Sequence, residues 1–369
     1  MTGTCRVRVG PVTIGLTGVD PTLPAVGVFA GLPPAGPDAP VDLRIAFEPG
    51  LRVPGRAARA VGRYPLYAAP GGLVVIDHVG REAYLPLADL GTRPVRIDPE
   101  LDLHVLQTWV QLPLLRMALH RAGGGLVRCT VVEVDGHRLA LVAPARAGKT
   151  RLVLALLRHG AGLVGDDWVA VDATGRCSPA CRLLVVRDEA RDDTGQRSVR
   201  SLLVLALRRA AAVLVRWRRL SLAMAHAADV VWRLGQQVRD VADVVPGARV
   251  AEQPAVLDEV VVLTSQATEA APVSASDAAT IAEMVAAAVV VEHPEQYVLD
   301  GVFRLVHPGI LPAGSLPAPA ADLERALTLL GPARVASMPI DDIGWTVRRL
   351  TGLSAEARST RRDDQGAQA

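Results

Sequence analysis

Lys149 and the neighbouring acids Asp166 and Asp167 are the residues whose types and spacing are suited to chemistry. Lys149 is the single lysine among the 40 lysine and arginine residues of the chain, which otherwise uses arginine throughout. A lysine ammonium is a compact point charge on a slim stem, so it can lie along a phosphate chain inside a tight loop. Carboxylates can hold Mg²⁺ or accept a proton from an attacking hydroxyl. These three side chains therefore indicate a site for a nucleotide.

The segment around Lys149 matches most of the phosphate-loop (Walker A) pattern G-x-x-x-x-G-K-[ST]. In this pattern glycine lets the backbone approach the phosphates, lysine reaches the β- and γ-oxygens, and the hydroxyl of Thr150 binds Mg²⁺. Ala143 departs from the pattern, because glycine at this position allows loop conformations that alanine resists. The residues predicted to contact the nucleotide are Ala143, Pro144, Ala145, Arg146, Ala147, Gly148, Lys149 and Thr150.

Asp166 and Asp167 are expected to have different roles, because adjacent residues at the end of a strand point in different directions. One carboxylate is expected to hold Mg²⁺ and the other to accept a proton. The alternative is that the two residues only close a turn or cap a helix. Two adjacent charges at the mouth of a buried strand are costly without a cation, which favours the first interpretation.

The pattern around these residues predicts that they meet at one edge of a sheet. Two apolar strands flank the turn signal Asp135-Gly136, and the second strand, residues 138–142, leads into the phosphate loop. A helix is predicted over residues 149–159, and it ends at Gly160. A short buried strand over residues 163–165 then carries the two acids at its carboxyl end. In an open α/β sheet, ligands bind at that edge.

The rest of the chain predicts a small β-rich domain followed by the nucleotide-binding domain. Residues 1–98 read as short strands, CRVRVGPVTIGL, VDLRIAF and GGLVVIDHVG, separated by loops such as GLPPAGPDAP. Residues 99–353 are expected to form the second domain, with a helical insertion over 199–244 and a disordered tail over 354–369. Further helices are predicted over 98–121, 276–291 and 322–330, and further strands over 168–172, 181–186, 260–263 and 334–339.

The helix predicted over residues 98–121 has two local signals. Asp98 is expected to be its N-cap and Gly123 its C-terminal stop. Pro113 is expected to kink the helix or split it in two, because proline lacks the N–H that an interior helical residue donates.

Composition excludes several classes of protein. A net charge of +2 in 369 residues, with pI near 8.5, gives no reason to expect nucleic-acid binding. No apolar run predicts a signal peptide or a membrane span, so a soluble, cytoplasmic protein is expected. Cys177 and Cys181 form a C-x₃-C pair without a second pair at zinc-like spacing, and they are expected to be free thiols.

Residues 126–179, LVRCTVVEVDGHRLALVAPARAGKTRLVLALLRHGAGLVGDDWVAVDATGRCSP, resemble the phosphate-loop segment of HPr kinase/phosphorylase and the wider group of HPr-kinase-like proteins. In that family a strand pair leads into G-x-S-G-x-G-K-[ST], then a helix, then a strand ending in Asp-Asp. Two departures stand out. Ala143, Ala145 and Arg146 stand where the family has glycine and serine, and Arg128 replaces a histidine.

The resemblance implies an α/β fold with a phosphate-loop, HPr-kinase-like core containing a mixed sheet. It implies ATP and Mg²⁺ as cofactors, and transfer of the γ-phosphoryl group to a hydroxyl of a protein, peptide or small-molecule acceptor. Asp166 would be the base for that hydroxyl, Lys149 a catalytic phosphate contact, and Thr150 and Asp167 the metal-side residues. The family assembles into oligomers, which leaves a homo-oligomer open. The alternative is a nucleotide-binding or scaffold module of a biosynthetic gene cluster that has lost phosphoryl transfer.

Overall fold

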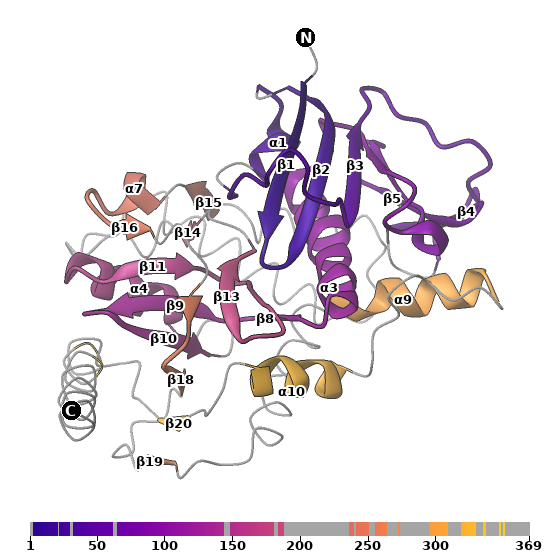
Figure 1. The fold of residues 1–369 in the computed structure, drawn as a ribbon. Coiled ribbons are helices and arrows are strands. Elements are labelled where there is room, and N and C mark those ends of the chain that lie inside the picture. The colour runs from indigo at the N-terminus through magenta and orange to yellow at the C-terminus, as the bar shows by residue number, and fades with distance from the viewer. Residues whose placement is uncertain are drawn as a thin grey trace, which may run out of the picture. The chain divides into compact units, whose positions relative to one another are not determined.

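The computed structural model describes residues 3–20, 22–29, 32–61, 65–143, 148–180, 184–187, 236–239, 241–250, 255–263, 272–273, 295–308, 319–329, 335–336, 347 and 350. Within them the protein is mixed α/β, with several sheets and few helices (Figure 1). The chain divides into two compact units. One comprises residues 1–182 and 247–369, and the other residues 183–246.

The N-terminal residues form a seven-stranded mixed sheet in the order β1-β2-β3-β7-β6-β5-β4. The segment CRVRVGPVTIGL, predicted as one strand, is a hairpin, because Gly10 turns the chain with a φ of 57°. The predicted strands VDLRIAF and GGLVVIDHVG correspond to β3 and β5. The strands are β1 (Gly3–Val9), β2 (Val12–Val19), β3 (Leu43–Phe47), β4 (Leu66–Ala69), β5 (Gly72–Ile76), β6 (Glu82–Leu85) and β7 (Val95–Ile97), with the short helices α1 (Pro24–Gly27) and η1 (Leu87–Asp89) between them.

A five-stranded sheet in the order β16-β11-β9-β10-β18 contains the predicted phosphate-binding region. Its strands are β9 (Thr130–Val134), β10 (His137–Val142), β11 (Gly162–Gly165), β16 (Arg249–Val250) and β18 (Glu259–Val262). The β9–β10 hairpin is confirmed. Asp135 and Gly136 both have a positive φ, 53° and 79°, as a type I′ turn requires. The buried strand predicted over 260–263 is confirmed as β18.

A four-stranded sheet has the order β17-β13-β12-β8, and its strand β12 comes shortly after the acid pair in the chain. It contains β8 (Gly125–Val127), β12 (Val169–Val171), β13 (Arg176–Pro179) and β17 (Ala255–Val256). Two strand pairs complete the described sheets: β14 (Leu184–Arg187) with β15 (Gln236–Arg239), and β19 (Pro272–Val273) with β20 (Val335–Ala336).

The helix predicted over 98–121 begins later and contains a π-helical turn. Asp102, not Asp98, is the N-cap: its carboxylate accepts hydrogen bonds from the N–H groups of His104 and Val105, both at 3.0 Å. The helical segment comprises α2 (Leu103–Val105), the π-helical turn η2 (Leu106–Gln111) and α3 (Leu112–Arg121). Pro113 lies directly after the π-helical turn, and the backbone stays helical through it, so the chain changes its helical hydrogen-bond register here and does not split into two helices. Gly123, with a φ of 77°, lies just beyond α3.

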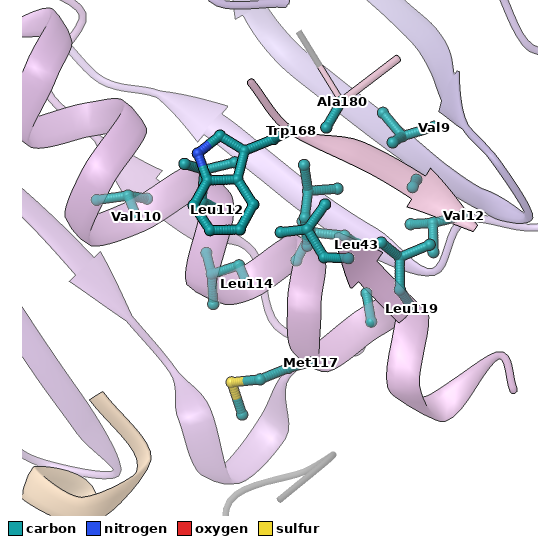
Figure 2. Packing of buried hydrophobic residues seen from close by; sticks show 14 of the residues in the cluster. Val9, Val12, Leu43, Val110, Leu112, Leu114, Met117, Leu119, Trp168 and Ala180 are labelled. Atoms are coloured by element: carbon teal, nitrogen blue, oxygen red, sulfur yellow. The ribbon is translucent and has the colours of Figure 1, made fainter. Parts of the chain in front are cut away.

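Trp168, directly after the acid pair, is the largest fully buried side chain among the described residues. It belongs to the same hydrophobic cluster as Leu112 and Leu114 of α3 (Figure 2). The N–H of Ala180 also donates to the carbonyl of Trp168 at 3.1 Å. A large side chain held on several sides fixes the backbone that precedes it, so this tryptophan anchors the acid pair.

The remaining helices are α4 (Lys149–Arg158), α7 (Val241–Val244), α9 (Glu295–Val306) and α10 (Pro319–Leu329). The helix predicted over 322–330 is confirmed as α10, whereas α9 was not predicted. Within the predicted helical insertion, residues 236–239 form the strand β15 instead, because they pair with β14. Residues 199–235, 276–291 and 354–369, with Cys181 and residues 144–147, lie outside the described residues.

Candidate nucleotide-binding site

The order of three strands brings the predicted site residues together. β10 and β11 are both antiparallel to β9, which lies between them, so the carboxyl ends of β10 and β11 share one edge of the sheet. β9 begins at that edge with Thr130, which is paired with Leu141 near the end of β10. The edge therefore receives Ala143 after β10, the acid pair after β11 and Thr130 from β9.

The N-terminus of α4 follows β10 at this edge and has no side-chain cap. Its N-cap is Gly148, which has a left-handed φ of 90° and provides no side-chain cap. The first bond within the helix runs from the N–H of Leu152 to the carbonyl of Gly148 at 3.1 Å, so the preceding N–H groups have no partner within the helix. No acidic residue lies in the first turn. Such a terminus is suited to an anion, because its N–H groups and the helix dipole are both positive there.

Lys149 extends from this helix towards both carboxylates. Its Nζ lies 4.0 Å from Oδ1 of Asp166 and 3.7 Å from Oδ1 of Asp167. The side chain is only 13% exposed, and within the described part of the chain Nζ has no hydrogen-bond partner. A buried ammonium without a hydrogen bond is unfavourable, so this group is placed to donate hydrogen bonds to an oxygen of an incoming ligand.

Asp166 is held in a dry environment. The residue is 6% exposed, and Oδ1 accepts a hydrogen bond from the hydroxyl of Thr130, a residue that is fully buried. Burial raises the pKa of Asp166 above its ordinary value, and Asp167 adds to the rise, whereas Lys149 and the Thr130 hydroxyl oppose it. A carboxylate with a raised pKa, held by one hydroxyl, has the properties of a general base.

Asp167 is more exposed and is surrounded by positive charge. Its carboxylate is 38% exposed, and Oδ1 accepts a hydrogen bond from Nε of Arg128 at 3.3 Å. Asp167 has a positive φ of 63°, and the N–H of Trp168 donates to the carbonyl of Asp166 at 2.8 Å across it. An oxygen of each carboxylate still lies within 4.0 Å of Nζ of Lys149, so the two acids differ in burial and in their other partners, while both face this amine. A positive φ in a residue other than glycine stores strain, which is common at functional sites.

The donor set fits a nucleotide and Mg²⁺. An oxygen from Thr150 and one from Asp167 are the ligands that Mg²⁺ prefers, and the free N-terminus of α4 suits the phosphates. Ala143 does not distort the loop where it is described. Among the described non-glycine residues, only Asp135 and Asp167 have a positive φ. Alanine at this position therefore needs no conformation restricted to glycine.

Two residues of this site were missed as contributors by sequence reasoning. Arg128 was noticed only as a departure from a family pattern, and Thr130 was not singled out. They are two residues apart where the chain enters β9, so in extended backbone their side chains emerge on the same side. That spacing, upstream of a phosphate loop, was the available signal. Their partners became identifiable only from the strand order.

The Thr130 hydroxyl is expected to hold the Asp166 carboxylate in one orientation. Thr130→Val removes the hydroxyl at nearly constant volume, so we expect a turnover number about 5- to 20-fold lower and an unchanged KM for ATP. Thr130→Ser keeps the hydroxyl and should retain most of the turnover. Steady-state ADP formation with a phosphorylatable acceptor measures both. Equal losses in the serine and valine variants would contradict this role.

Comparisons with known proteins add little to what these residues indicate about the kind of site. No protein-family model matches the sequence, and no curated protein matches it. An HPr(Ser) kinase/phosphatase from Coxiella burnetii is a weak structural neighbour with 13% identity and a TM-score of 0.22. The alignment covers 41% of this chain and 67% of that chain. Similarity of that degree carries no argument about activity, which must be argued from this chain's own residues.

Among the described helices, none is long and apolar enough to cross a membrane. A separate finding concerns the cysteines near the site. The structure places Cys129 and Cys177 in the core as free thiols, and burial raises the pKa of Cys129 to about 12. Since a thiol with a raised pKa stays protonated and unreactive, Cys129 is a packing residue although it lies next to Arg128 and Thr130.

Proposed function

We propose that the protein is an ATP-dependent kinase that transfers the γ-phosphoryl group of Mg·ATP to a hydroxyl of a protein, peptide or small-molecule acceptor. The observation that carries the proposal is the convergence of the uncapped α4 N-terminus, the buried amine of Lys149 and two differently held carboxylates. Positioning and charge neutralisation are most of what phosphoryl transfer requires.

In this mechanism the residues of α4 bind and orient the phosphates. The first-turn N–H groups and Gly148 hold the β- and γ-phosphates, and Lys149 moves from the carboxylates to a phosphate oxygen. Thr150 and Asp167 would hold Mg²⁺, which neutralises phosphate charge during the transfer. Asp166 accepts the proton of the acceptor hydroxyl as that oxygen attacks the γ-phosphorus, and the bond from the γ-phosphorus to the bridging oxygen breaks, so ADP leaves with that oxygen. The burial of Asp166 keeps water away and makes the carboxylate a stronger base.

A second candidate function is a nucleotide-binding module without phosphoryl transfer. It is favoured by one observation: Arg128 and Lys149 already neutralise the carboxylate on the metal side of the site. A site of this kind would bind ATP, yet phosphorylate no acceptor. The two functions differ only in turnover, so one set of binding and turnover measurements separates them.

Lys149→Ala tests both candidate functions, because each requires a phosphate ligand for this amine. A charge-assisted hydrogen bond contributes about 1.5–3 kcal/mol, so ATP affinity should fall roughly 10- to 100-fold. Isothermal titration calorimetry with Mg·ATP measures the affinity. Arg158→Ala, a basic residue in the last turn of the same helix, is the matched control and should bind ATP normally.

Equal affinity in wild type and Lys149→Ala would exclude a nucleotide site at this sheet edge. If ATP binds and the purified protein forms no ADP with candidate serine- and threonine-bearing acceptors, the binding module is favoured. Formation of phosphorylated acceptor by wild type, and its loss in Lys149→Ala, would support the kinase.

A further inference from the structure

Arg128 forms an ion pair with Asp167, the carboxylate that is assigned to the metal side of the proposed site. Its Nε lies 3.3 Å from Oδ1 of Asp167, and its side chain is only 14% exposed. The same oxygen also lies 3.7 Å from Nζ of Lys149. A single carboxylate oxygen therefore faces two cations, one from the start of α4 and one from the segment that leads into β9.

The four charged side chains that meet in the described part of the site carry equal numbers of positive and negative charges. Arg128 and Lys149 contribute two positive charges, and Asp166 and Asp167 contribute two negative charges when both are ionised. A divalent cation that approaches Asp167 therefore meets two positive charges at the oxygen it needs. Lys149 can move from Asp167 to a phosphate at the start of α4, whereas Arg128 comes from a different segment, the residues between β8 and β9.

We propose that Arg128 is a built-in counter-ion of Asp167 that competes with divalent cations for this carboxylate, and so weakens metal binding at the site. The inference deepens the proposed function and rests on it, because Asp167 is assigned to the metal side of a nucleotide site. It assigns Arg128 a regulatory role: Mg·ATP binds productively only when Arg128 is drawn away from Asp167. The fraction of protein that binds Mg·ATP productively then depends on the affinity for the metal ion as well as on the affinity for ATP.

The deciding experiment uses Mn²⁺ alone, without nucleotide, and detects binding by electron paramagnetic resonance of the free ion. Arg128→Gln should bind Mn²⁺ roughly tenfold more tightly than wild type, because one partly buried unit charge is removed from beside the carboxylate. Arg128→Lys keeps the charge and should bind Mn²⁺ as weakly as wild type. Adding Asp167→Asn to Arg128→Gln should abolish the gain, which locates it at this carboxylate.

Arg138→Gln is the matched control for the change in net charge. Arg138 lies on β10, and its Nε is paired with Glu133 of β9 at 2.9 Å. This pair is next to the hairpin turn, at the opposite end of the two strands. Its Mn²⁺ affinity should equal that of wild type. An equal gain in Arg138→Gln would mean that overall charge, and not the contact with Asp167, controls metal binding.

If Arg128→Gln does not fold, Arg128→His provides the same test. An ordinary histidine is neutral at pH 8, so this variant should also gain Mn²⁺ affinity there. Unchanged or weaker Mn²⁺ binding in the folded variant that lacks the positive charge would overturn the inference.

A parallel titration with Mg·ATP keeps the two proposals distinguishable. If neither wild type nor Arg128→Gln binds ATP, the proposed nucleotide function fails. A Mn²⁺ gain that depends on Asp167 would still uphold the role of Arg128 as its counter-ion. If wild type binds Mg·ATP and Arg128→Gln has the same Mn²⁺ affinity as wild type, the nucleotide site stands and the counter-ion role is wrong.

Discussion

Asp166→Asn is expected to lower the turnover number roughly 100- to 10,000-fold, the range that a positioned general base contributes. Asparagine has nearly the same shape and can still accept the hydrogen bond from Thr130, so the geometry of the site is retained. What is lost is the ability to take a proton from the acceptor hydroxyl. The KM for ATP should change little, because in the proposed mechanism it is the N-terminus of α4 that binds the phosphates. Steady-state ADP formation at saturating ATP measures both constants.

The control for this variant is the same chemical change elsewhere on the sheet. Asp135→Asn lies in the exposed turn between β9 and β10, where Asn-Gly is a preferred type I′ pair, so folding and turnover should be unaffected. Undiminished turnover in Asp166→Asn would show that another group accepts the proton. Loss of ATP binding in the same variant would mean that Asp166 organises the site without acting as a base.

The raised pKa of Asp166 gives this prediction a pH dependence. The base must be deprotonated, so the turnover number should rise with pH through a pKa above the ordinary value for aspartate. The sign for stability is opposite. Since the folded state binds the proton more tightly than the unfolded state, the contribution of Asp166 to stability falls as pH rises through its raised pKa. At neutral pH, Asp166→Asn should therefore melt at a higher temperature than wild type, which differential scanning calorimetry can check.

The parts of the site that were predictable from sequence depend on short-range signals. The Asp135-Gly136 turn, the helix after the phosphate loop and its end at Gly160 are encoded by adjacent residues, and the structure has all three. The position of the acid pair followed from these elements, because a helix between two strands that run in the same direction returns the chain to the same edge. Such features follow from the alternation of apolar and polar residues and from the residue preferences of turns, without knowledge of the fold.

The features that were missed depend on partners far apart in the chain. Asp102 replaces the predicted Asp98 as N-cap, and its own N–H donates to the carboxylate of Asp77, 25 positions earlier, at 3.1 Å. Residues 236–239 read as helix, yet they pair with a strand about fifty positions earlier. The contact of Arg128 with Asp167 spans 39 positions and depends on β9 lying between β10 and β11. No local pattern contains that order, so no local pattern could reveal the contact.

The largest expected effect on stability comes from a buried ion pair between two distant helices. Nε of Arg116 in α3 donates to Oδ2 of Asp322 in α10 at 2.6 Å, and both side chains are 1% exposed. Asp322→Ala removes the carboxylate and leaves the guanidinium buried without it, which should destabilise the protein by about 3–5 kcal/mol. Urea unfolding monitored by circular dichroism measures the change. Because α10 packs against β8, the loss should also loosen the strand that leads to Arg128.

Two comparisons separate the burial of this pair from its geometry. Arg96 and Glu48 are also 2.6 Å apart, but their side chains are 35% and 39% exposed, so Glu48→Ala should cost less than about 1 kcal/mol. Replacing Arg116 and Asp322 together by leucine should restore most of the stability, because neither the buried guanidinium nor its carboxylate then has to be desolvated. If the double variant is as unstable as Asp322→Ala, this part of the core requires the specific geometry of the ion pair. If the double variant is as stable as wild type, the ion pair serves to fix the position of α10 relative to α3. Most of the destabilisation in Asp322→Ala then comes from Arg116 being buried without its carboxylate.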